Sequence, residues 1–348
     1  VKTKKPIGRI GIPQASTFFE LFPMWKAFFT ELGFEIVLSR NTNRQVINKG
    51  LEHVNAETCF PIKVSHGHVV DMLDKDIDYL FLPSVINMTH ASSKVTHSYA
   101  CPYVQCLPYI IRSAIDLDSQ KFKVLQPIIH FEYGESFLDK NLRQIAREAG
   151  CRGRRVETAI KMAKETQESF YEQLETRGKD VLDKLGEEDF ALVIISRPYN
   201  GCDSGVNLDL PEKLRDLGVL AIPMDFLTLD LEDISKDYPN MYWKYGQKIL
   251  AAARVIARDK RLYALYITNF GCGPDSFISK FFPKEVGGKP FLMIDIDEHS
   301  ADAGIMTRCE AFLDSLKNAR IKEFKRERER KYKFSKNKKK TIFIPYMN

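Results

Sequence analysis

Three cysteines of this chain share one local pattern, in which a proline follows within two residues. The segments are Cys59-Phe60-Pro61, Cys101-Pro102 and Cys272-Gly273-Pro274. Proline is favoured in the first turn of a helix, where its missing N–H is not needed, so we expect each cysteine at a helix N-terminus. The unpaired N–H groups and the helix dipole there stabilise an anion and lower the pKa of a thiol. Three such thiols, far apart in sequence, favour a shared ligand, and an iron–sulfur cluster suits them best.

We expect Cys59 and Cys101 from the first half, and Cys272 from the second, to hold a 4Fe–4S cluster. Three ligands leave one iron open to a fourth ligand or a substrate. Cys106 is a secondary candidate, since it lies five residues after Cys101, but Cys101 precedes proline directly and fits the pattern better. Cys202 follows a predicted strand and is a candidate fourth ligand.

Other interpretations of these residues stay open. Buried free cysteines are common and behave as small hydrophobic residues, and Cys151 and Cys309, in helical contexts, fit that role. Zinc is a competing metal, because His66 and His68 follow Cys59 on an expected helix. His66 lies seven residues beyond Cys59, about 10 Å along a helix, so one ion cannot readily bind both. A nucleophilic Cys–His enzyme centred on Cys59 is a further alternative.

The composition limits the class of protein. A chain of 348 residues with 44% hydrophobic content is long enough for two domains of ordinary size. No apolar run approaches the ~20 residues that cross a bilayer, so no membrane association is expected. Seven cysteines in a chain this long do not form a dense disulfide framework, which favours a reducing cytoplasm. No secretory signal is recognised at the start, and because the chain begins at Val1 and not at Met we expect it to be a piece of a longer protein.

The positive charge is concentrated near the end of the chain. Residues 317–340 carry thirteen Lys or Arg against three Glu, and the rest of the chain is mildly acidic. Glu323, Glu327 and Glu329 are interspersed among the basic residues at helical spacing, so we expect a solvated helix or linker and no nucleic-acid binding. No phosphate-binding G-x-x-x-x-G-K-[ST] or G-x-G-x-x-G motif is present, so any ATP that drives the system is hydrolysed by another domain or protein.

Strand and helix patterns alternate along both halves. Strands are expected at Arg9–Pro13, Phe34–Ser39, Tyr79–Pro83, Val124–Phe131, Ala191–Arg197, Val219–Met224, Leu262–Asn269 and Pro290–Ile296. Helices are expected at Pro23–Leu32, Arg44–Val54, Ile62–Leu73, Leu210–Leu217, Asn240–Arg258 and Asp302–Leu316. This alternation is typical of βαβ units and predicts an α/β fold with parallel sheets. Four regions follow: an α/β domain at 1–134, a helical connector at 135–188, a second α/β domain at 189–316, and a basic linker with the start of a following domain at 317–348.

Polar residues follow the expected strands, where an open parallel sheet binds its ligands. These strand-end segments are 83–87, 197–200, 224–225, 269–272 and 295–299. They direct both halves toward a cleft between them. The segment Lys340–Tyr346 resembles the opening strand Arg9–Gln14, so we expect a further domain of the same kind to begin there.

The motifs around the cysteines resemble those of a known family. Residues 57–61, 101–105 and 269–276, supported by 240–246 and 297–304, are similar to the 2-hydroxyacyl-CoA dehydratase-related proteins of anaerobic bacteria. The chain looks most like the non-ATPase part of the large acyl-CoA dehydratase activase-related proteins, over most of residues 7–316. The resemblance implies two flavodoxin-like domains that hold a 4Fe–4S cluster through Cys59, Cys101 and Cys272. It also implies an ATP-hydrolysing activator that delivers low-potential electrons, and further domains of the same polypeptide.

Two classes of function remain at this stage. The first is an iron–sulfur redox module of an ATP-dependent electron-transfer or reductase system, rather than a complete enzyme. The second is a non-catalytic scaffold that binds a partner and whose cysteines are structural.

Overall fold

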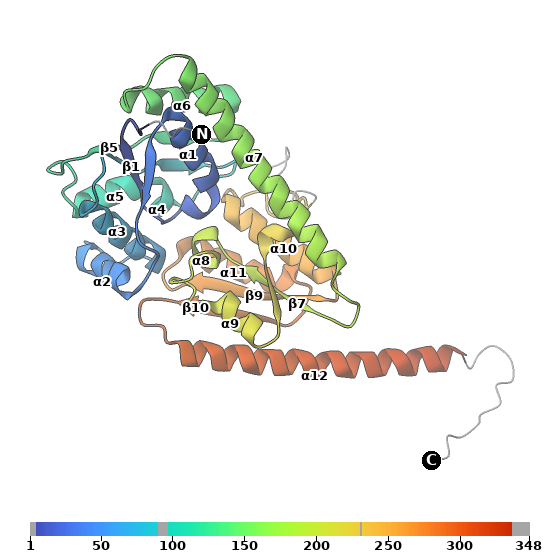
Figure 1. The fold of residues 1–348 in the computed structure, drawn as a ribbon. Coiled ribbons are helices and arrows are strands. Elements are labelled where there is room, and N and C mark those ends of the chain that lie inside the picture. The colour runs from blue at the N-terminus through green and yellow to red at the C-terminus, as the bar shows by residue number, and fades with distance from the viewer. Residues whose placement is uncertain (1–4, 90–96, 230–231, 336–348) are drawn as a thin grey trace. The chain divides into compact units, whose positions relative to one another are not determined.

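The computed structural model describes residues 5–89, 97–229 and 232–335. The chain divides into a compact unit, Val1–Ser300, and a second unit, Ala301–Asn348. The first contains parallel sheets covered by helices, so the expected α/β fold is confirmed (Figure 1). The second contains helix α12 (Asp302–Ser335), which extends well beyond the predicted end at Leu316. The segment Lys340–Tyr346, in which we expect a strand, lies outside the described residues.

The first sheet has the strand order β2-β1-β3-β5, and all of its pairs are parallel. Its strands are β1 (Arg9–Ile12), β2 (Glu35–Leu38), β3 (Tyr79–Phe81) and β5 (Lys123–Leu125). The helices of this half are α1 (Phe18–Leu32), α2 (Arg44–His53), α3 (Phe60–Leu73), α4 (Pro102–Gln105) and α5 (Leu107–Ala114). Every residue of α3 except Leu73 is buried, so this helix lies in the interior of the fold.

Two prolines interrupt neighbouring strands at matching positions. The predicted strand Val124–Phe131 is wrong as a single element, because it divides at Pro127 into β5 and β6 (Ile128–His130). Pro83 likewise separates β3 from β4 (Ser84–Asn87), a strand in a segment interpreted above as a strand-end loop. Strands β4 and β6 pair in parallel as a separate two-stranded sheet. Proline lacks the N–H that would continue the ladder, so both strands break there.

The second sheet repeats the order of the first. Its parallel order is β10-β9-β7-β8, formed by β7 (Ala191–Ile195), β8 (Leu220–Pro223), β9 (Leu262–Asn269) and β10 (Phe291–Ile296). Its helices are α8 (Pro198–Gly201), α9 (Leu210–Asp216), η1 (Met224–Phe226), α10 (Lys244–Arg258) and α11 (Gly273–Glu285). In both sheets the first strand lies between the second and the third. This is the flavodoxin-like arrangement, so the two expected flavodoxin-like sheets are confirmed.

Two helices join the sheets, in the part of the chain where we expect a helical connector. They are α6 (Glu135–Glu148) and the long α7 (Arg154–Asp183), which leads from the first half toward β7 (Figure 1). Helix α7 packs along α1, and α1 begins at Phe18, five residues before the predicted start at Pro23. Pro23 therefore lies inside the helix, and the side chain of Gln167 from α7 hydrogen-bonds to the backbone on either side of it. The Gln167 Nε2 donates to the Glu20 carbonyl at 2.9 Å, and its Oε1 accepts from the Met24 N–H at 3.2 Å.

One buried carboxylate ties α1 to both α7 and α10. Glu20 is 6% exposed and accepts hydrogen bonds from the Tyr171 hydroxyl at 3.1 Å and the Tyr245 hydroxyl at 2.6 Å. Burial, followed by the nearby charge of Glu20, holds the pKa of both phenols well above the ordinary value. Both phenols thus stay protonated and donate to the carboxylate. This contact fixes the first half of the unit against the second.

Candidate functional site

The three predicted cysteines lie where the prolines indicated. Cys59 is the N-cap of α3, Cys101 of α4 and Cys272 of α11, and each helix has proline in its first two positions. The expectation of three helix N-termini is therefore confirmed. Each of the three is partly buried, whereas Cys106 is exposed. Cys106 also caps a helix, α5, which has Pro108 at its second position, so the helix-start pattern alone does not separate it from Cys101.

The topology of the second sheet places Cys272 at a position that typically binds ligands. The chain leaves β7 toward β8 on one side and returns to β9 on the other, so the winding direction changes between β7 and β9. Ligands of open α/β sheets bind beyond the carboxyl ends of the strands at such a switch point. Arg197 follows β7 there, and Cys272 follows β9.

The three thiols act on a common neighbour, the Tyr199 phenol. Burial is the main reason why the pKa of Tyr199 lies well above its ordinary value. Arg197 lowers this pKa, and charges on Cys101, Cys272 and Cys59 raise it further. After burial, a charge on Cys101 raises the pKa of Cys59, and a charge on Cys59 adds a small increase to the pKa of Cys272. The structure thus brings together thiols from both halves of the unit.

The expected lowering of the thiol pKa values is wrong for two of these cysteines. Burial raises the pKa of Cys59 to about 11 and that of Cys272 to about 12. The backbone N–H groups of Ile62 and Asp275 favour the two thiolates, as a helix N-terminus should, but desolvation of a charged sulfur is larger. The helix N-termini therefore do lower the pKa values of these two thiols, but burial raises them by more.

A buried cation lies directly against Cys272. Arg197 is 2% exposed, and its Nη1 lies 3.4 Å from the Cys272 Sγ and 2.5 Å from the Asp275 Oδ2. Asp275 also accepts from the Thr268 hydroxyl at 2.6 Å and the Tyr266 hydroxyl at 2.9 Å. Despite burial, the Arg197 charge and these donors hold the pKa of Asp275 below its ordinary value. The sequence placed Arg197 at a strand end but gave no sign of its pairing with Asp275.

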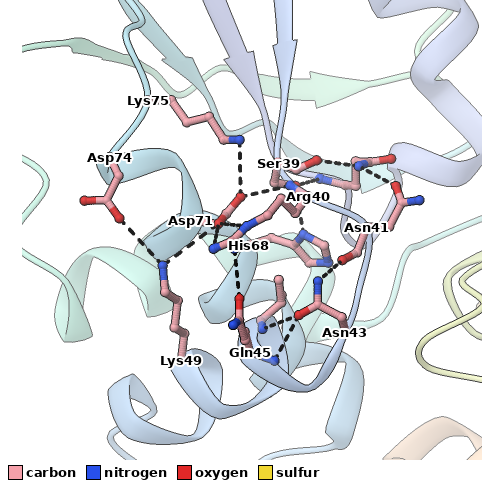
Figure 2. A network of polar contacts seen from close by, with 12 residues as sticks. Ser39, Arg40, Asn41, Asn43, Gln45, Lys49, His68, Asp71, Asp74 and Lys75 are labelled. Carbon is pink, nitrogen blue, oxygen red and sulfur yellow. Dashed lines mark hydrogen bonds and ion pairs between the residues drawn. The ribbon is translucent and has the colours of Figure 1, made fainter.

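A polar network orients α3, which begins at Cys59. Asp71, buried near the end of α3, accepts from the Arg40 backbone N–H at 2.9 Å and from its Nε at 2.7 Å (Figure 2). Lys75 lies 3.6 Å from the same carboxylate. The ring of His68 is held on both sides, with Nδ1 2.8 Å from the Ser39 hydroxyl and Nε2 2.8 Å from the Thr42 hydroxyl. These contacts fix the rotation of α3 about its axis.

A second group of contacts crosses between the halves near the same helix. Lys63, one turn beyond Cys59 and 4% exposed, donates to Glu57 and, at 2.6 Å, to Glu298 after β10. The Thr42 hydroxyl donates to Asp203, in the loop after α8, at 2.6 Å. Glu298 was part of a strand-end segment noted from the sequence. Lys63 was missed, because its partner Glu298 lies 235 positions away and no local pattern indicates the pairing.

The remaining candidates lie elsewhere or have other partners. Burial, followed by the charges of Asp225 and Glu20, raises the pKa of Cys202 to about 11, and none of the three helix-capping thiols is among its main influences. Both ring nitrogens of His68 have hydrogen-bond partners, whereas His66 Nδ1 contacts the Ile62 carbonyl and its buried Nε2 has no partner among the described residues. Within the described residues, no three His, Cys, Asp or Glu side chains are arranged to hold a single metal ion.

Two flavodoxin-like parallel sheets in one compact unit define a two-sheet α/β protein. The chain belongs to the CoA enzyme activase uncharacterised domain family (DUF2229), whose model matches residues 9–227. It is therefore an acyl-CoA dehydratase activase-related protein, as its motifs indicated, and it fits a dehydratase-activating system.

Other comparisons add little. No curated protein matches the chain. Among solved structures, it is similar to the periplasmic zinc binding protein TroA from Treponema pallidum, at 10% identity and a TM-score of 0.29 over 90% of this chain and 99% of that one. It is also similar to a Mn-bound periplasmic metal binding protein from Candidatus Liberibacter asiaticus, at 9% identity and a TM-score of 0.24 over 84% and 91%. Neither likeness, at these scores, bears on the ligand of this chain. No helix in the described part of the chain combines the length and apolar character needed to span a membrane.

Proposed function

We propose that this protein is an iron–sulfur redox module of a dehydratase-activating system, with a 4Fe–4S cluster held by Cys59, Cys101 and Cys272. One observation carries the proposal: three cysteines cap helices from both halves of the compact unit, and the buried Arg197 guanidinium lies 3.4 Å from the Cys272 Sγ. A cluster of this kind accepts and releases single electrons at potentials set by its charge, hydrogen bonds and exposure.

The donor set fits a cluster better than it fits a single ion. Two thiolates on one zinc ion lie at most about 4.6 Å apart, since each Zn–S bond is ~2.3 Å. A four-iron cluster is larger and takes thiolates that stand farther apart than the ligands of one ion. Unpartnered buried atoms also occur beside the thiols. The Thr58 hydroxyl and both amide atoms of Asn200 contact no hydrogen-bonding group in the described structure.

The surrounding residues have distinct roles in this proposal. Arg197 supplies a fixed positive charge beside Cys272, which favours an anionic sulfur, and Asp275 holds the guanidinium in place. The N–H groups of Ile62 and Asp275 favour the thiolates of Cys59 and Cys272. Tyr199, 8% exposed, excludes water from the space between the thiols.

The partner in this proposal is an ATP-hydrolysing activator, a domain or a separate protein, working with a dehydratase component. Exposed aromatic side chains next to the cysteines support docking there. Phe270, two residues before Cys272, is 74% exposed, and Tyr103, two residues after Cys101, is 38% exposed. Aromatic residues are enriched in the contact regions of protein interfaces.

Anaerobic reconstitution with iron and sulfide tests the cluster. We expect about four iron and four sulfide per chain, with absorption near 400 nm, and a reduced-state EPR signal. Replacing Cys59, Cys101 or Cys272 by serine should each remove most of the bound iron. Cys309→Ser is the matched control, because Cys309 is a buried helical cysteine outside the site. Iron binding that survives the triple Cys→Ser variant would overturn the proposal.

The alternative is a non-catalytic scaffold with structural cysteines. The raised pKa values of Cys59 and Cys272 favour this scaffold function, because protonated thiols pack well in a buried site. Under this alternative the reconstituted protein stays colourless, and the triple variant differs from the parent in stability alone.

A further inference from the structure

Helix α11 exposes a stripe of aromatic and basic side chains. Phe277, Lys280, Phe281 and Lys284 all lie at the surface, at positions i, i+3, i+4 and i+7 of the helix. Residues at this spacing form one face of a helix. Phe277 is 60% exposed and Phe281 39% exposed, whereas phenylalanine usually lies inside a fold. The stripe begins five residues after Cys272, about 7.5 Å along the helix axis.

Further aromatic rings continue this surface toward the start of α10. The centroid of the Trp243 ring lies 6.1 Å from that of Phe277 and 5.0 Å from that of Tyr242, which is 45% exposed. The Tyr238 ring lies 5.1 Å from the Phe281 ring. We call these five residues the aromatic face. Exposed apolar side chains that are in contact with one another mark an interaction surface, whereas single ones are ordinary.

Contacts within the fold hold the aromatic face in place. The Tyr238 hydroxyl donates to Glu285 at 2.6 Å, and the Arg254 guanidinium lies 6.0 Å from the centroid of the same ring. The Tyr242 carbonyl accepts from the Tyr99 N–H at 2.8 Å. Groups that are fixed before binding lose little conformational freedom when a partner docks.

The free charge beside the aromatic face is positive. Asp237 and Glu285 each pair with Arg254 at 2.5 Å. Lys280 and Lys284, in contrast, have no hydrogen bond or ion pair among the described residues. Two unpaired positive charges one turn apart favour a partner that presents carboxylates to them.

We propose that the aromatic face, with Lys280 and Lys284, binds a helix of a partner protein that carries glutamate or aspartate beside an apolar stripe. An amphipathic helix lays its apolar side against such a surface, and its carboxylates then pair with the lysines. A second copy of this chain suits the surface less, because a two-fold contact brings the lysines of both copies together. In placing this partner beside Cys272 the inference rests on the proposed function, but binding itself needs no cluster.

Fluorescence anisotropy of a labelled synthetic peptide, titrated with the cluster-free protein, tests the proposal. The probe is a helix of about 18 residues, long enough to form in water, with a leucine stripe flanked by glutamates. Its twin has lysine in place of each glutamate. We expect saturable binding of the acidic probe, at least ten-fold tighter than that of the twin, with an affinity that falls as salt is added. No saturable binding of the acidic probe, or equal binding of the twin, overturns the proposal.

Substitutions at exposed positions separate the two features of the surface. Phe277→Ser should weaken binding of the acidic probe at least ten-fold, and Tyr109→Ser, at a residue 51% exposed on α5, is the matched control. Lys280→Glu/Lys284→Glu should reverse the preference between the two peptides, and Lys140→Glu, at an exposed position of α6, should leave it unchanged. Parent-like affinity in Phe277→Ser, or a parent-like preference in the double lysine variant, contradicts the proposal.

Two measurements detect the other occupants of this surface. Sedimentation velocity reports self-association, and co-sedimentation with vesicles of phosphatidylcholine and phosphatidylglycerol reports binding to an anionic membrane. We expect neither for the parent protein. If either occurs and Phe277→Ser abolishes it, while the acidic probe does not bind, a second copy or a lipid surface occupies the aromatic face and the proposal is wrong.

Discussion

Replacement of Gly67 by alanine tests how α3, and with it Cys59, is held. Helices α2 and α3 meet backbone to backbone, with Gly67 of α3 against Val46 of α2 and Gly50 of α2 against Lys63 of α3. A Cβ on Gly67 would lie 1.9 Å from the Val46 carbonyl oxygen and 3.0 Å from the Gly50 nitrogen. Real Cβ atoms are rarely closer than 3.0 Å to another heavy atom, so one helix must move by about 1.1 Å.

The cost of that movement follows from the surroundings of α3. Its neighbours at this contact are backbone atoms, which no rotamer change can remove, and almost all of the helix is buried. Overpacking of a core costs about 1–3 kcal/mol, and we expect the upper end here. The gain in helix propensity from glycine to alanine returns about 1 kcal/mol. We therefore expect a net loss of about 2 kcal/mol, equivalent to a Tm lower by roughly 4–8 °C.

Thermal and urea unfolding of Gly67→Ala measure this loss. Gly304→Ala is the matched control, because Gly304 is also helical but a Cβ there meets nothing within 4 Å. It should be as stable as the parent or slightly more so. Gly67→Ala with a Tm equal to that of Gly304→Ala would show that the helices part without cost, and would refute the inference that this contact fixes Cys59.

Two further predictions concern buried charges. Arg197→Met should lower the free energy of unfolding, measured in urea, by about 3–5 kcal/mol, because it leaves Asp275 buried without its cation. The double variant Arg197→Met/Asp275→Asn should recover most of that loss. Equal stability of the single and double variants would contradict this. Burial lowers the pKa of His68 to about 4, so the unfolded chain takes up this proton first and stability falls by about 3 kcal/mol as the pH drops from about 6.5 to about 4. Burial raises the pKa of Asp203 to about 6, so this group makes the free energy of unfolding fall as the pH rises from about 4 to about 6, opposite to the effect of His68. In His68→Gln the effect of Asp203 should remain, and stability should fall with rising pH in that window. A pH profile of stability like that of the parent would contradict the assignment.

Local sequence rules located the cysteines because proline acts within one helical turn. Cys59, Cys101 and Cys272 were placed at helix starts from adjacent residues alone, and the structure agrees. The same rule failed at Pro23, which lies inside α1. There the apolar face of α1, including Trp25 and Phe28, is fully buried, and tertiary packing outweighs the cost of about 3 kcal/mol for an interior proline.

Long-range electrostatics could not be derived in the same way. The thiol pKa values depend on how deeply three sequence-distant segments are buried together, and no local pattern reports that depth. The pairing of Arg197 with Asp275 joins residues 78 positions apart. Sequence placed Arg197 at a strand end, but the switch point that brings Asp275 beside it follows from the strand order.

The separation of the thiols is set by contacts that contain no cysteine. Two of the thiols belong to the first half and one to the second, so their spacing depends on how the halves of the compact unit pack. The side-chain pairs that cross between these halves include Glu20 with Tyr245, Thr42 with Asp203, and Lys63 with Glu298. Each is largely buried, and breaking one leaves a polar group without its partner. A ligand bound by all three thiols would bridge the same halves, so its binding and these contacts must stabilise one another.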